Sequence, residues 1–457
     1  MSGHSIGRAL GLAMYFLMAG VAADERVDSA LDLELQHAGS ARVTILFDAG
    51  DPADGTATGR ADRQQQIRIL ADQIISTAGS GFELNRRFTL VSAVVGTLDR
   101  TTLDRVLSLP SVRAVGLDPS GSGHLDVARE LLGINIIQAA PPKGLGIIGQ
   151  NVKVVVMDSG IDSDSVDFGG VLLDEACFCS DSGAGCCPGG GTTQLGLGAA
   201  EDDHGHGTWV SGHVLSQGLD GPLGAAPAAD LVAVKVLDSN NAFCCASDVT
   251  AAYDWIATNH PDADVLNASL GTNARFAAEC SDDAAFLIAM AQATAAVRAN
   301  GTLMTASSGN NLDINGLVAP SCLADVMAVG ATYKQNYSVG CAFPQAGSMV
   351  DDVACFSNAS PELEILAPGA FMNTTDLGGG TITGIAGTSF ASPLVAGCAA
   401  LVKAAMPALT DDAIRSLLIK SGVPVQDDRN GETYPRLDCL RAVLDTDVVF
   451  RDEFELN

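Results

Sequence analysis

The amino-acid sequence predicts an α/β protein whose main part is a parallel sheet flanked by helices on both faces, preceded by a small α+β region. Short runs of β-branched and apolar residues, such as 152–157, are typical of buried parallel strands. From there on, such runs alternate with longer helical segments, which favours a sheet covered on both sides. A Gly/Ser-rich segment at 118–123 separates the two parts, and all 12 cysteines lie after residue 176.

Residues 1–23 have the features of a secretory signal peptide. Arg8 supplies a positive charge, residues 9–22 form a short apolar run, and small residues precede Asp24. The alternative is a membrane anchor, but the run is short for a bilayer span. No later stretch reads as long and apolar enough to cross a membrane. We therefore expect a secreted protein, extracellular or periplasmic, without a membrane anchor.

Residues 24–123 are predicted to form the small α+β region. We expect strands at 41–47, 88–95 and 112–117 and helices at 61–77 and 101–109. The isoleucine and leucine residues of the longer helix are spaced to share one face, which therefore packs on the sheet. The serine and glycine residues of the segment that follows indicate an exposed linker and a domain boundary at residue 123.

Residues 124–445 are predicted to form the large domain, and the charged residues 446–457 an acidic C-terminal tail. We expect strands at 152–157, 231–237, 263–270, 301–307, 326–331 and 363–366, helices at 248–259 and 283–299, and a last helix capped by Thr410. The Gly- and Cys-rich segment 162–200 interrupts this alternation. We expect it to be a surface loop tied by disulfides rather than part of the core.

An even number of cysteines in an exported chain favours disulfides. The rival interpretation is a zinc site, but the spacing lacks paired Cys-x-x-Cys motifs. Connectivity does not follow from the sequence. Three pairings serve as working hypotheses: Cys341 with Cys355, Cys280 with Cys322, and Cys398 with Cys439.

The composition restricts the classes of partner. A hydrophobic content of 47% with 17% charged residues is typical of a globular domain. The net charge of −29 disfavours nucleic acids and anionic membranes, because both repel an acidic protein.

Ser389 is the first candidate for a functional residue. Two small residues lead into it, and an apolar helical pattern with an early Pro393 follows at once. Ser389 is therefore expected to cap or open a helix, where backbone N–H groups and the positive end of the helix dipole favour a developing negative charge. On its own, such a serine is more often a simple N-cap.

Three further residues favour a catalytic role for Ser389 over a simple N-cap. Asp158 ends the buried strand at 152–157, and functional groups gather at the carboxyl ends of such strands. His206 lies in a glycine-flanked segment, and Asn310 follows the predicted strand at 301–307. A serine nucleophile needs an adjacent base, an acid that orients the base, and amide donors for the oxyanion. His206, Asp158 and Asn310 are candidates for the base, the orienting acid and an amide donor.

The segments around these residues resemble the subtilase family of serine peptidases. The matching motifs are Asp158-Ser159-Gly160, His206-Gly207-Thr208, Ser308-Gly309-Asn310 and Gly387-Thr388-Ser389-Phe390-Ala391-Ser392-Pro393. The order Asp, His, Ser is the order found in subtilisins. The resemblance extends from about residue 151 to about residue 420.

The resemblance implies a subtilisin-like sheet and a catalytic mechanism. Ser389 would be the nucleophile, His206 the base, Asp158 the group that orients His206, and Asn310 an oxyanion donor. His204 is the rival for the base, but only His206 is followed by Gly-Thr. The region 24–123 would be a propeptide that assists folding and inhibits the enzyme until it is removed.

Two positions depart from the pattern common in the family. Trp209 and Leu394 stand where many subtilases carry a histidine. Neither belongs to the implied triad. His213 lies further along the chain, and we expect it to be a packing residue or a surface polar group.

The same resemblance implies two walls of a substrate pocket. One would contain Ser269, Leu270 and Gly271, and the other Ser308 and Gly309. Small side chains there leave room for a sizeable residue, so our hypothesis is a preference for apolar or aromatic side chains on the acyl side of the cleaved bond.

No cofactor is expected for the chemistry, and no catalytic metal. Calcium is common in the family, and Asp-rich loops offer oxygen ligands for a structural calcium ion. The candidate ligands are Asp162, Asp164, Asp167, Asp202 and Asp203.

The sequence therefore predicts a secreted serine endopeptidase made as a self-processing zymogen and acting as a monomer on protein or peptide substrates. Its own propeptide would be an intramolecular inhibitor. The alternative is a non-catalytic, subtilase-like scaffold that binds peptides or partners.

Overall fold

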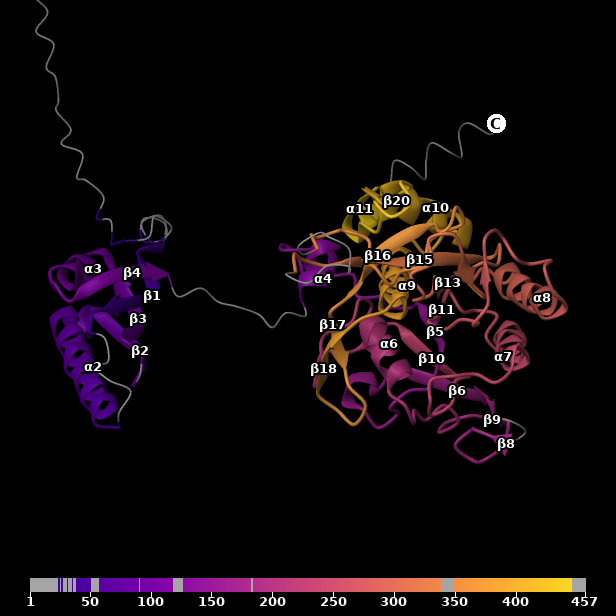
Figure 1. Ribbon diagram of the computed structural model, residues 1–457, viewed down its shortest axis with the longest axis horizontal. Coiled ribbons are helices and arrows are strands. Elements are labelled where there is room, and N and C mark those ends of the chain that lie inside the picture. Colours follow the sequence, from indigo (N-terminus) through magenta and orange to yellow (C-terminus); the bar gives the residue numbers. More distant parts are fainter. Residues whose placement is uncertain are drawn as a thin grey trace, which may run out of the picture. The chain divides into compact units, whose positions relative to one another are not determined.

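The computed structural model describes residues 38–50, 57–89, 91–117, 126–181, 184–337 and 348–445, together with positions 24, 26, 27, 31 and 35. The chain divides into two compact units, Met1–Gly121 and Ser122–Asn457, and each is described by itself. Figure 1 shows both. The predicted signal peptide 1–23, the linker at 118–123 and the tail 446–457 lie outside the described residues.

The first unit is a four-stranded antiparallel sheet with helices packed on it. Its elements are β1 (Ser40–Phe47), α2 (Ala57–Ala78), the 3₁₀ turn η1 (Gly79–Gly81), β2 (Phe82–Arg87), β3 (Ala93–Asp99), α3 (Arg100–Leu107) and β4 (Val112–Leu117). The strand order is β2-β3-β1-β4. Alternate residues of β1, such as Val43 and Ile45, are buried against Ile67 and Ile74 of α2.

The predicted strand at 88–95 is right only for residues 93–95, which belong to β3. The chain forms two strands here, β2 and β3, which pair as an antiparallel hairpin. β2 lies at the edge of the sheet, and after Phe82 all its residues are exposed. Only Phe82 and Leu84 alternate with polar residues, which is too short a pattern to predict a strand.

The second unit is built on a ten-stranded sheet. In spatial order its strands are β19 (Val423–Gln426), β20 (Thr433–Arg436), β16 (Ile365–Ala370), β15 (Val326–Tyr333), β13 (Leu303–Ser307), β11 (Val265–Ala268), β5 (Lys153–Asp158), β10 (Asp230–Lys235), β6 (Leu172–Phe178) and β9 (Thr193–Leu195). The strands from β20 to β6 pair in parallel, and only the two edge strands pair antiparallel.

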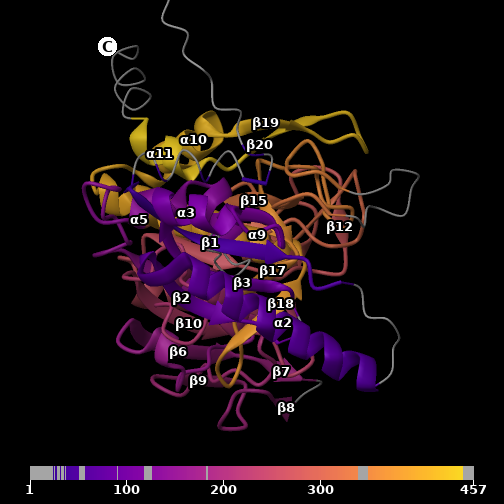
Figure 2. The same cartoon turned by 90° about the vertical axis from the view of Figure 1, so that its left-hand side faces the viewer.

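Helices cover both faces of this sheet, as the sequence predicts. They are α4 (Asp126–Leu131), α5 (Ile134–Gln138), α6 (His206–Leu215), α7 (Ala246–Asn259), α8 (Ala285–Ala299), α9 (Thr388–Ala405), α10 (Asp411–Ser421) and α11 (Cys439–Leu444), with the 3₁₀ turn η2 (Val166–Phe168). Short strands form three ribbons: β7 (Ser180–Asp181) with β8 (Ala184–Gly185), β12 (Arg275–Phe276) with β14 (Leu317–Val318), and β17 (Met372–Thr375) with β18 (Thr381–Ile385). Figure 2 shows α10 and α11 gathered with β19 and β20 at one end of the unit.

The alternation of side chains along β5 separates the two layers. Val154 and Val156 pack in the cluster that includes α6 and α9. Val155 and Met157 pack in the cluster that includes α7 and α8. Because successive side chains of a strand point to opposite faces, an uninterrupted apolar run is what a doubly covered strand requires.

The segment 162–200 is only partly the surface loop that we predicted. Its residues 172–178 form β6, which pairs in parallel with β10 inside the large sheet. The prediction failed because β6 carries acidic residues, among them Glu175, which is buried and accepts hydrogen bonds from the backbone of Gly198 and Ala200. A carboxylate can be buried in a core strand when its oxygens accept hydrogen bonds, but in the sequence such an acidic residue is typical of a loop.

The disulfide prediction is confirmed for the described cysteines. The bonds are Cys177–Cys187, Cys179–Cys186, Cys244–Cys245, Cys280–Cys322 and Cys398–Cys439. Two of the hypothesised pairings are among them. The third involves Cys341, which lies outside the described residues.

Removing the Cys398–Cys439 disulfide is expected to destabilise the fold substantially. The bond ties the buried helix α9 to α11 across 41 residues. The double variant Cys398→Ala/Cys439→Ala should lose about 2–5 kcal/mol of unfolding free energy, because a long loop is released in the unfolded chain. Denaturant unfolding measures this. The variant Cys179→Ala/Cys186→Ala removes a bond between cysteines only 7 residues apart, so it should lose less unfolding free energy. Equal losses in the two variants would contradict the explanation by loop length.

Helix α9 corrects the expectation that no later stretch is long and apolar enough to cross a membrane. By length and composition it meets that test, but 83% of it is buried inside the unit. It packs against α6 and against strands β13, β15 and β16. Its apolar sequence therefore reflects a core position, since a helix that is apolar all round is buried.

Candidate active site

Asp158 is the last residue of β5, near the middle of the sheet, as the sequence predicts. Its side chain is buried, and its Oδ1 accepts hydrogen bonds from the backbone N–H of Ser159 at 2.8 Å and from the ring of His206. Its second oxygen, Oδ2, has no protein partner. Asp158 thus presents a fixed carboxylate at the carboxyl end of the strand.

His206 is the first residue of α6, and glycine allows this helix to approach the end of β5. A Cβ atom at Gly207 would lie 2.1 Å from the backbone oxygen of Gly160, which is too close for any other residue. The Asp-Ser-Gly and His-Gly-Thr segments therefore pack backbone to backbone. This close approach is what brings the His206 ring to the Asp158 carboxylate.

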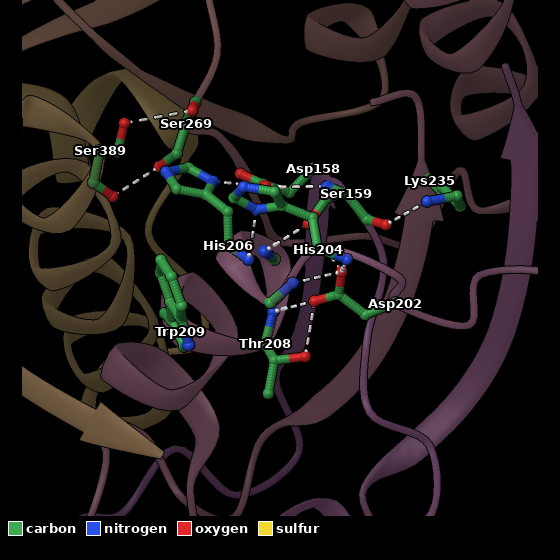
Figure 3. Close-up of polar contacts among 12 residues, drawn as sticks. Asp158, Ser159, Asp202, His204, His206, Thr208, Trp209, Lys235, Ser269 and Ser389 are labelled. Atoms are coloured by element: carbon green, nitrogen blue, oxygen red, sulfur yellow. Dashed lines mark hydrogen bonds and ion pairs between the residues drawn. The ribbon is translucent and has the colours of Figure 1, made fainter. Parts of the chain in front are cut away.

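The distance between His206 Nδ1 and Asp158 Oδ1 is 2.6 Å, in a buried site (Figure 3). Burial lowers the pKa of His206, but the charge of Asp158 and this hydrogen bond outweigh burial, and Asp202 adds to them. The pKa of His206 is therefore raised above its ordinary value. The bond also orients the ring, so that Nε2 is the nitrogen left to exchange a proton.

Ser389 lies in the first turn of α9 but is not its N-cap. The N-cap is Gly387, so the expectation that Ser389 opens the helix is confirmed and the N-cap interpretation is wrong. In this structure the Ser389 hydroxyl hydrogen bonds to the backbone oxygen of Ser269 at 3.3 Å. The Ser269 hydroxyl in turn donates to the backbone oxygen of Ser389 at 2.8 Å, which fixes the start of the helix.

Asn310 lies beyond the end of β13 and is held by the start of α9. Its Oδ1 accepts hydrogen bonds from the backbone N–H and the hydroxyl of Thr388, both at 2.9 Å. Since these donors occupy the carbonyl end of the carboxamide, its NH₂ end is the one available to a ligand. Asn310 lines the same cleft as Ser389 and His206.

That cleft has a volume of about 470 Å³ and brings together segments far apart in the sequence. Ser389, His206 and Asn310 all line it. Of the residues predicted for the two walls of the substrate pocket, four line the cleft: Ser269, Leu270, Gly271 and Gly309. The fifth, Ser308, is fully buried, and its hydroxyl donates to the backbone oxygen of Asn358. Sequence reasoning missed the other wall, which is formed by residues 241–244, Ala246 and Phe286.

A second cavity of about 330 Å³ lies on another side of Ser389 and includes Trp209. The indole N–H of Trp209 donates to Asp376 at 2.9 Å, and its ring is edge-on to His206. Leu394 is buried in the core instead. The first departure from the family pattern therefore shapes the site, and the second affects only packing.

A buried polar network that the sequence analysis did not identify joins the loops carrying Asp158 and His206. The Ser159 hydroxyl donates to Asp202 at 2.9 Å and accepts from the backbone N–H of Gly207 at 2.8 Å. Asp202 also accepts four bonds from the backbone and hydroxyl groups of residues 204–208. Figure 3 shows Ser159, Asp202 and Thr208 of this network beside and below the His206 ring.

Lys235, at the end of β10, completes the network. Its side chain is fully buried, and its Nζ donates to the backbone oxygen of Ser159 at 2.7 Å and to Asp203 at 2.6 Å. An ammonium group taken from water needs such partners. Lys235 therefore ties the turn after Asp158 to the loop before His206.

Three of the five candidate calcium ligands, Asp167, Asp202 and Asp203, use their carboxylates for contacts within the protein. Both carboxylate oxygens of Asp202 are used by the network above, and those of Asp167 accept from the backbone of residues 219–221 and from Thr375. Asp203 pairs with Lys235. These three acids hold loops together, and protein donors occupy both carboxylate oxygens of Asp167 and Asp202.

Within the described residues, one group of metal-ligating side chain types lies within 4.8 Å: Cys244, Cys245 and Asp248. The two sulfur atoms are joined in a disulfide, so they are not available as thiolate ligands.

The other two histidines near the cleft have different surroundings. His204 is half-buried, and its Nδ1 accepts from the backbone N–H of His206 at 3.3 Å. His213 is buried and stacks on Phe390, and burial lowers its pKa to about 4. It is therefore neutral in the core, which confirms the packing interpretation.

One protein family and several known proteins are similar to this chain. Residues 149–437 match the subtilase family (Peptidase_S8). Subtilisin E of Bacillus subtilis strain 168 is 31% identical over 390 residues, covering 82% of this chain and 90% of that protein. Subtilisin amylosacchariticus of Bacillus subtilis subsp. amylosacchariticus is 31% identical over 388 residues, with the same coverage.

Among solved structures, a protease of Pseudoalteromonas arctica PAMC 21717 has a similar fold. It superposes with a TM-score of 0.53 at 23% identity, covering 71% of this chain and 94% of that chain. At this identity the similarity concerns the fold alone.

Proposed function

The chain belongs to the subtilase family and is a serine-type endopeptidase acting on peptide bonds, and we propose that it works through Ser389, His206 and Asp158. The main support for this proposal is the geometry of one buried pair. The buried bond between His206 and Asp158 at 2.6 Å opens onto the cleft that also contains the Ser389 hydroxyl at the start of a helix. A binding scaffold has no need of such a buried pair.

In the proposed mechanism, the Ser389 hydroxyl turns from the backbone oxygen of Ser269 toward His206 Nε2 when substrate binds. His206 takes the proton as Ser389 attacks the peptide carbonyl, and then returns it to the leaving amine. Asp158 holds the ring and stabilises the imidazolium that forms between these steps. The high pKa of His206 supports this role, because it reflects a preference for the charged ring.

The oxyanion of the tetrahedral intermediate would be stabilised by the Asn310 side chain and by the backbone N–H of Ser389. Support comes from the two bonds between Thr388 and the carbonyl oxygen of Asn310, which turn the NH₂ group to the cleft side. A donor fixed before the reaction needs no reorganisation as the charge develops.

Replacing Asn310 with alanine is expected to lower kcat by about 10²–10³-fold, with KM little changed, because the lost bond forms only in the transition state. Steady-state kinetics on a peptide amide measures both constants. The matched control is Asn273→Ala, which removes a carboxamide from the same cleft without touching Thr388 and should leave kcat within about twofold. Equal losses in the two variants would refute the assigned role.

The substrate proposal is a preference for apolar or aromatic residues on the acyl side of the cleaved bond. Among the described residues that line the cleft, His206 is the only one with a titratable side chain, and Leu270, Val318 and Gly271 add apolar or open surface. A charged substrate side chain would lose its hydration there without gaining a partner.

A peptide series that differs only at this residue tests the proposed function. We expect kcat/KM to be highest for phenylalanine, leucine or methionine and at least about tenfold lower for arginine or aspartate. A strict preference for arginine or aspartate would overturn the specificity proposal. No cleavage of any peptide would favour the scaffold alternative.

We further propose that the enzyme is an exported, self-processing zymogen. Residues 1–23 would be the signal peptide, 24–123 the propeptide, 124–445 the catalytic domain and 446–457 a tail. The match to subtilisin E covers more of the chain than the unit Ser122–Asn457 contains, so it extends into the first unit. The disulfides support export, since such bonds persist in oxidising compartments.

A further inference from the structure

The disulfide Cys244–Cys245 joins neighbouring residues on the wall of the substrate cleft. Cys244 lines the cavity that contains Ser389 and His206, and it is exposed. The other described disulfides join residues that are 7 to 42 positions apart, and none of their cysteines lines this cleft.

Global stability does not explain this bond. A disulfide stabilises a fold by restricting the unfolded chain, and the effect grows with the length of the loop that it closes. Cys280–Cys322 and Cys398–Cys439 close long loops, whereas Cys244–Cys245 spans a single residue step. Its effect is therefore local, on the backbone between the two cysteines.

The C-terminal side of this bond is anchored. Cys245 is the N-cap residue of α7, and its backbone oxygen accepts from the N–H of Asp248 at 3.0 Å. The Asp248 carboxylate accepts from the backbone and hydroxyl of Ser180 at 2.8 and 3.1 Å. Ser180 lies in the hairpin that Cys177–Cys187 and Cys179–Cys186 close, so the start of α7 is fixed to a rigid neighbour.

The N-terminal side is anchored by a turn. The Asp238 carboxylate accepts from the backbone N–H of Asn240 and Ala242 at 2.8 and 3.0 Å, and the Asp238 N–H donates to the oxygen of Ala242. Between Ala242 and Cys245 lie Phe243 and Cys244, both of which line the cleft. The disulfide is thus the covalent restraint on the one stretch of this wall that lies between the two anchors.

We propose that Cys244–Cys245 is a redox-sensitive specificity element, which in its oxidised form holds Phe243 and Cys244 in the shape that binds an extended peptide. This rests on the proposed function and concerns substrate binding, not the chemistry at Ser389. A dithiol reduces the element: the S–S bond breaks, each cysteine sulfur gains one hydrogen, and the dithiol becomes its own disulfide. An exposed sulfur is open to such attack, unlike the buried Cys280, Cys398 and Cys439.

The test compares a short and a long substrate that share the same cleaved residue. The short one is an N-acetylphenylalanine ester, which occupies the pocket beside Ser389. The long one is a hexapeptide amide, which extends along the cleft. In Cys244→Ala/Cys245→Ala we expect the ratio of kcat/KM, long over short, to fall about fivefold to tenfold through KM, because a loosened wall must be ordered on binding.

The control is Cys179→Ala/Cys186→Ala, which removes another short-range disulfide whose cysteines do not line the cleft. Cys177–Cys187 still closes the hairpin that carries Ser180, so the anchor at Asp248 is kept. Its ratio should equal that of the wild type. A ratio unchanged in Cys244→Ala/Cys245→Ala, with the ester still cleaved, would overturn the inference while leaving the proposed function intact. Failure of the wild type to cleave either substrate would overturn the proposed function, and this inference with it.

The redox part of the proposal is tested on the wild type treated with low concentrations of dithiothreitol. The reduced cysteines are then alkylated and identified by peptide mass spectrometry. We expect Cys244 and Cys245 to be alkylated first, with the same fall in ratio, and reoxidation to restore it. Cys244→Ala/Cys245→Ala treated alike should show no further fall. A fall of equal size in that variant would assign the effect to another disulfide and refute the redox part.

Discussion

Replacing Ser389 with alanine is expected to lower kcat by about 10⁶-fold, the size of loss known for the nucleophile of subtilisins. The Ser389 hydroxyl donates to the backbone oxygen of Ser269, and Ser389 lines the same cleft as His206. Without it no acyl-enzyme forms, and only the oxyanion donors and substrate binding remain. Steady-state hydrolysis of a peptide amide measures the loss, and KM should change little.

The same variant tests self-processing when the intact mass of the exported chain is compared with that of the wild type. We expect only the wild type to lose a piece ending near residue 123. If both stay full length after signal removal, the scaffold alternative gains support. If both are trimmed alike, another protease makes the cut. The Thr388→Ser variant is a matched control, since it keeps the hydroxyl that bonds Asn310 and should still be processed.

Replacing Asp158 with asparagine is expected to lower kcat by about 10⁴-fold, as known for the orienting acid of such triads. The carboxylate accepts from His206 Nδ1 at 2.6 Å, and an amide in its place can donate instead. The ring would then turn its other tautomer to the cleft, where Nε2 carries a hydrogen and cannot accept one from Ser389. Folding should persist, because the side chain keeps its size.

The residual activity of Asp158→Asn should also show a different pH dependence. A base works only when neutral, so activity is lost as the pH falls through the pKa of His206. Asp158 raises that pKa, and removing its charge lets burial lower it. The acid limb of the kcat/KM profile is therefore expected to move to lower pH. Asp254→Asn, a charge change on α7 away from the cleft, should leave the limb in place; an unshifted limb in Asp158→Asn would refute this account.

Much of the large domain was predictable because its strands are continuous apolar runs. β5, β10, β13 and β15 all lie within a few residues of the predicted ranges. β2 and β6 escaped prediction for opposite reasons. β2 is an exposed edge strand without an apolar pattern, and β6 lies in the sheet but contains the buried acid Glu175. Period and composition cannot predict a strand whose polar groups are satisfied by distant backbone.

The candidate site was predictable only where a short motif carries the chemistry. Asp158, His206, Asn310 and Ser389 each lie in such a motif, and the structure brings three of them to one cleft with the fourth behind His206. The network of Ser159, Asp202 and Lys235 was not predicted, since its hydrogen bonds join residues 43 and 76 positions apart. Asp202 was only one of several candidate calcium ligands, because a solvated acidic loop and a buried carboxylate that accepts many hydrogen bonds look alike in sequence.

The burial of α9 bears on how the enzyme loses activity on heating. From Thr388 to Val402 every residue of this helix is buried, and it contacts both α6 and the central strands. A segment packed in this way opens only when the whole unit unfolds, so its amide hydrogens should exchange with solvent at the rate of global unfolding. The nucleophile is part of that segment. Thermal inactivation should therefore follow the unfolding rate of the entire unit.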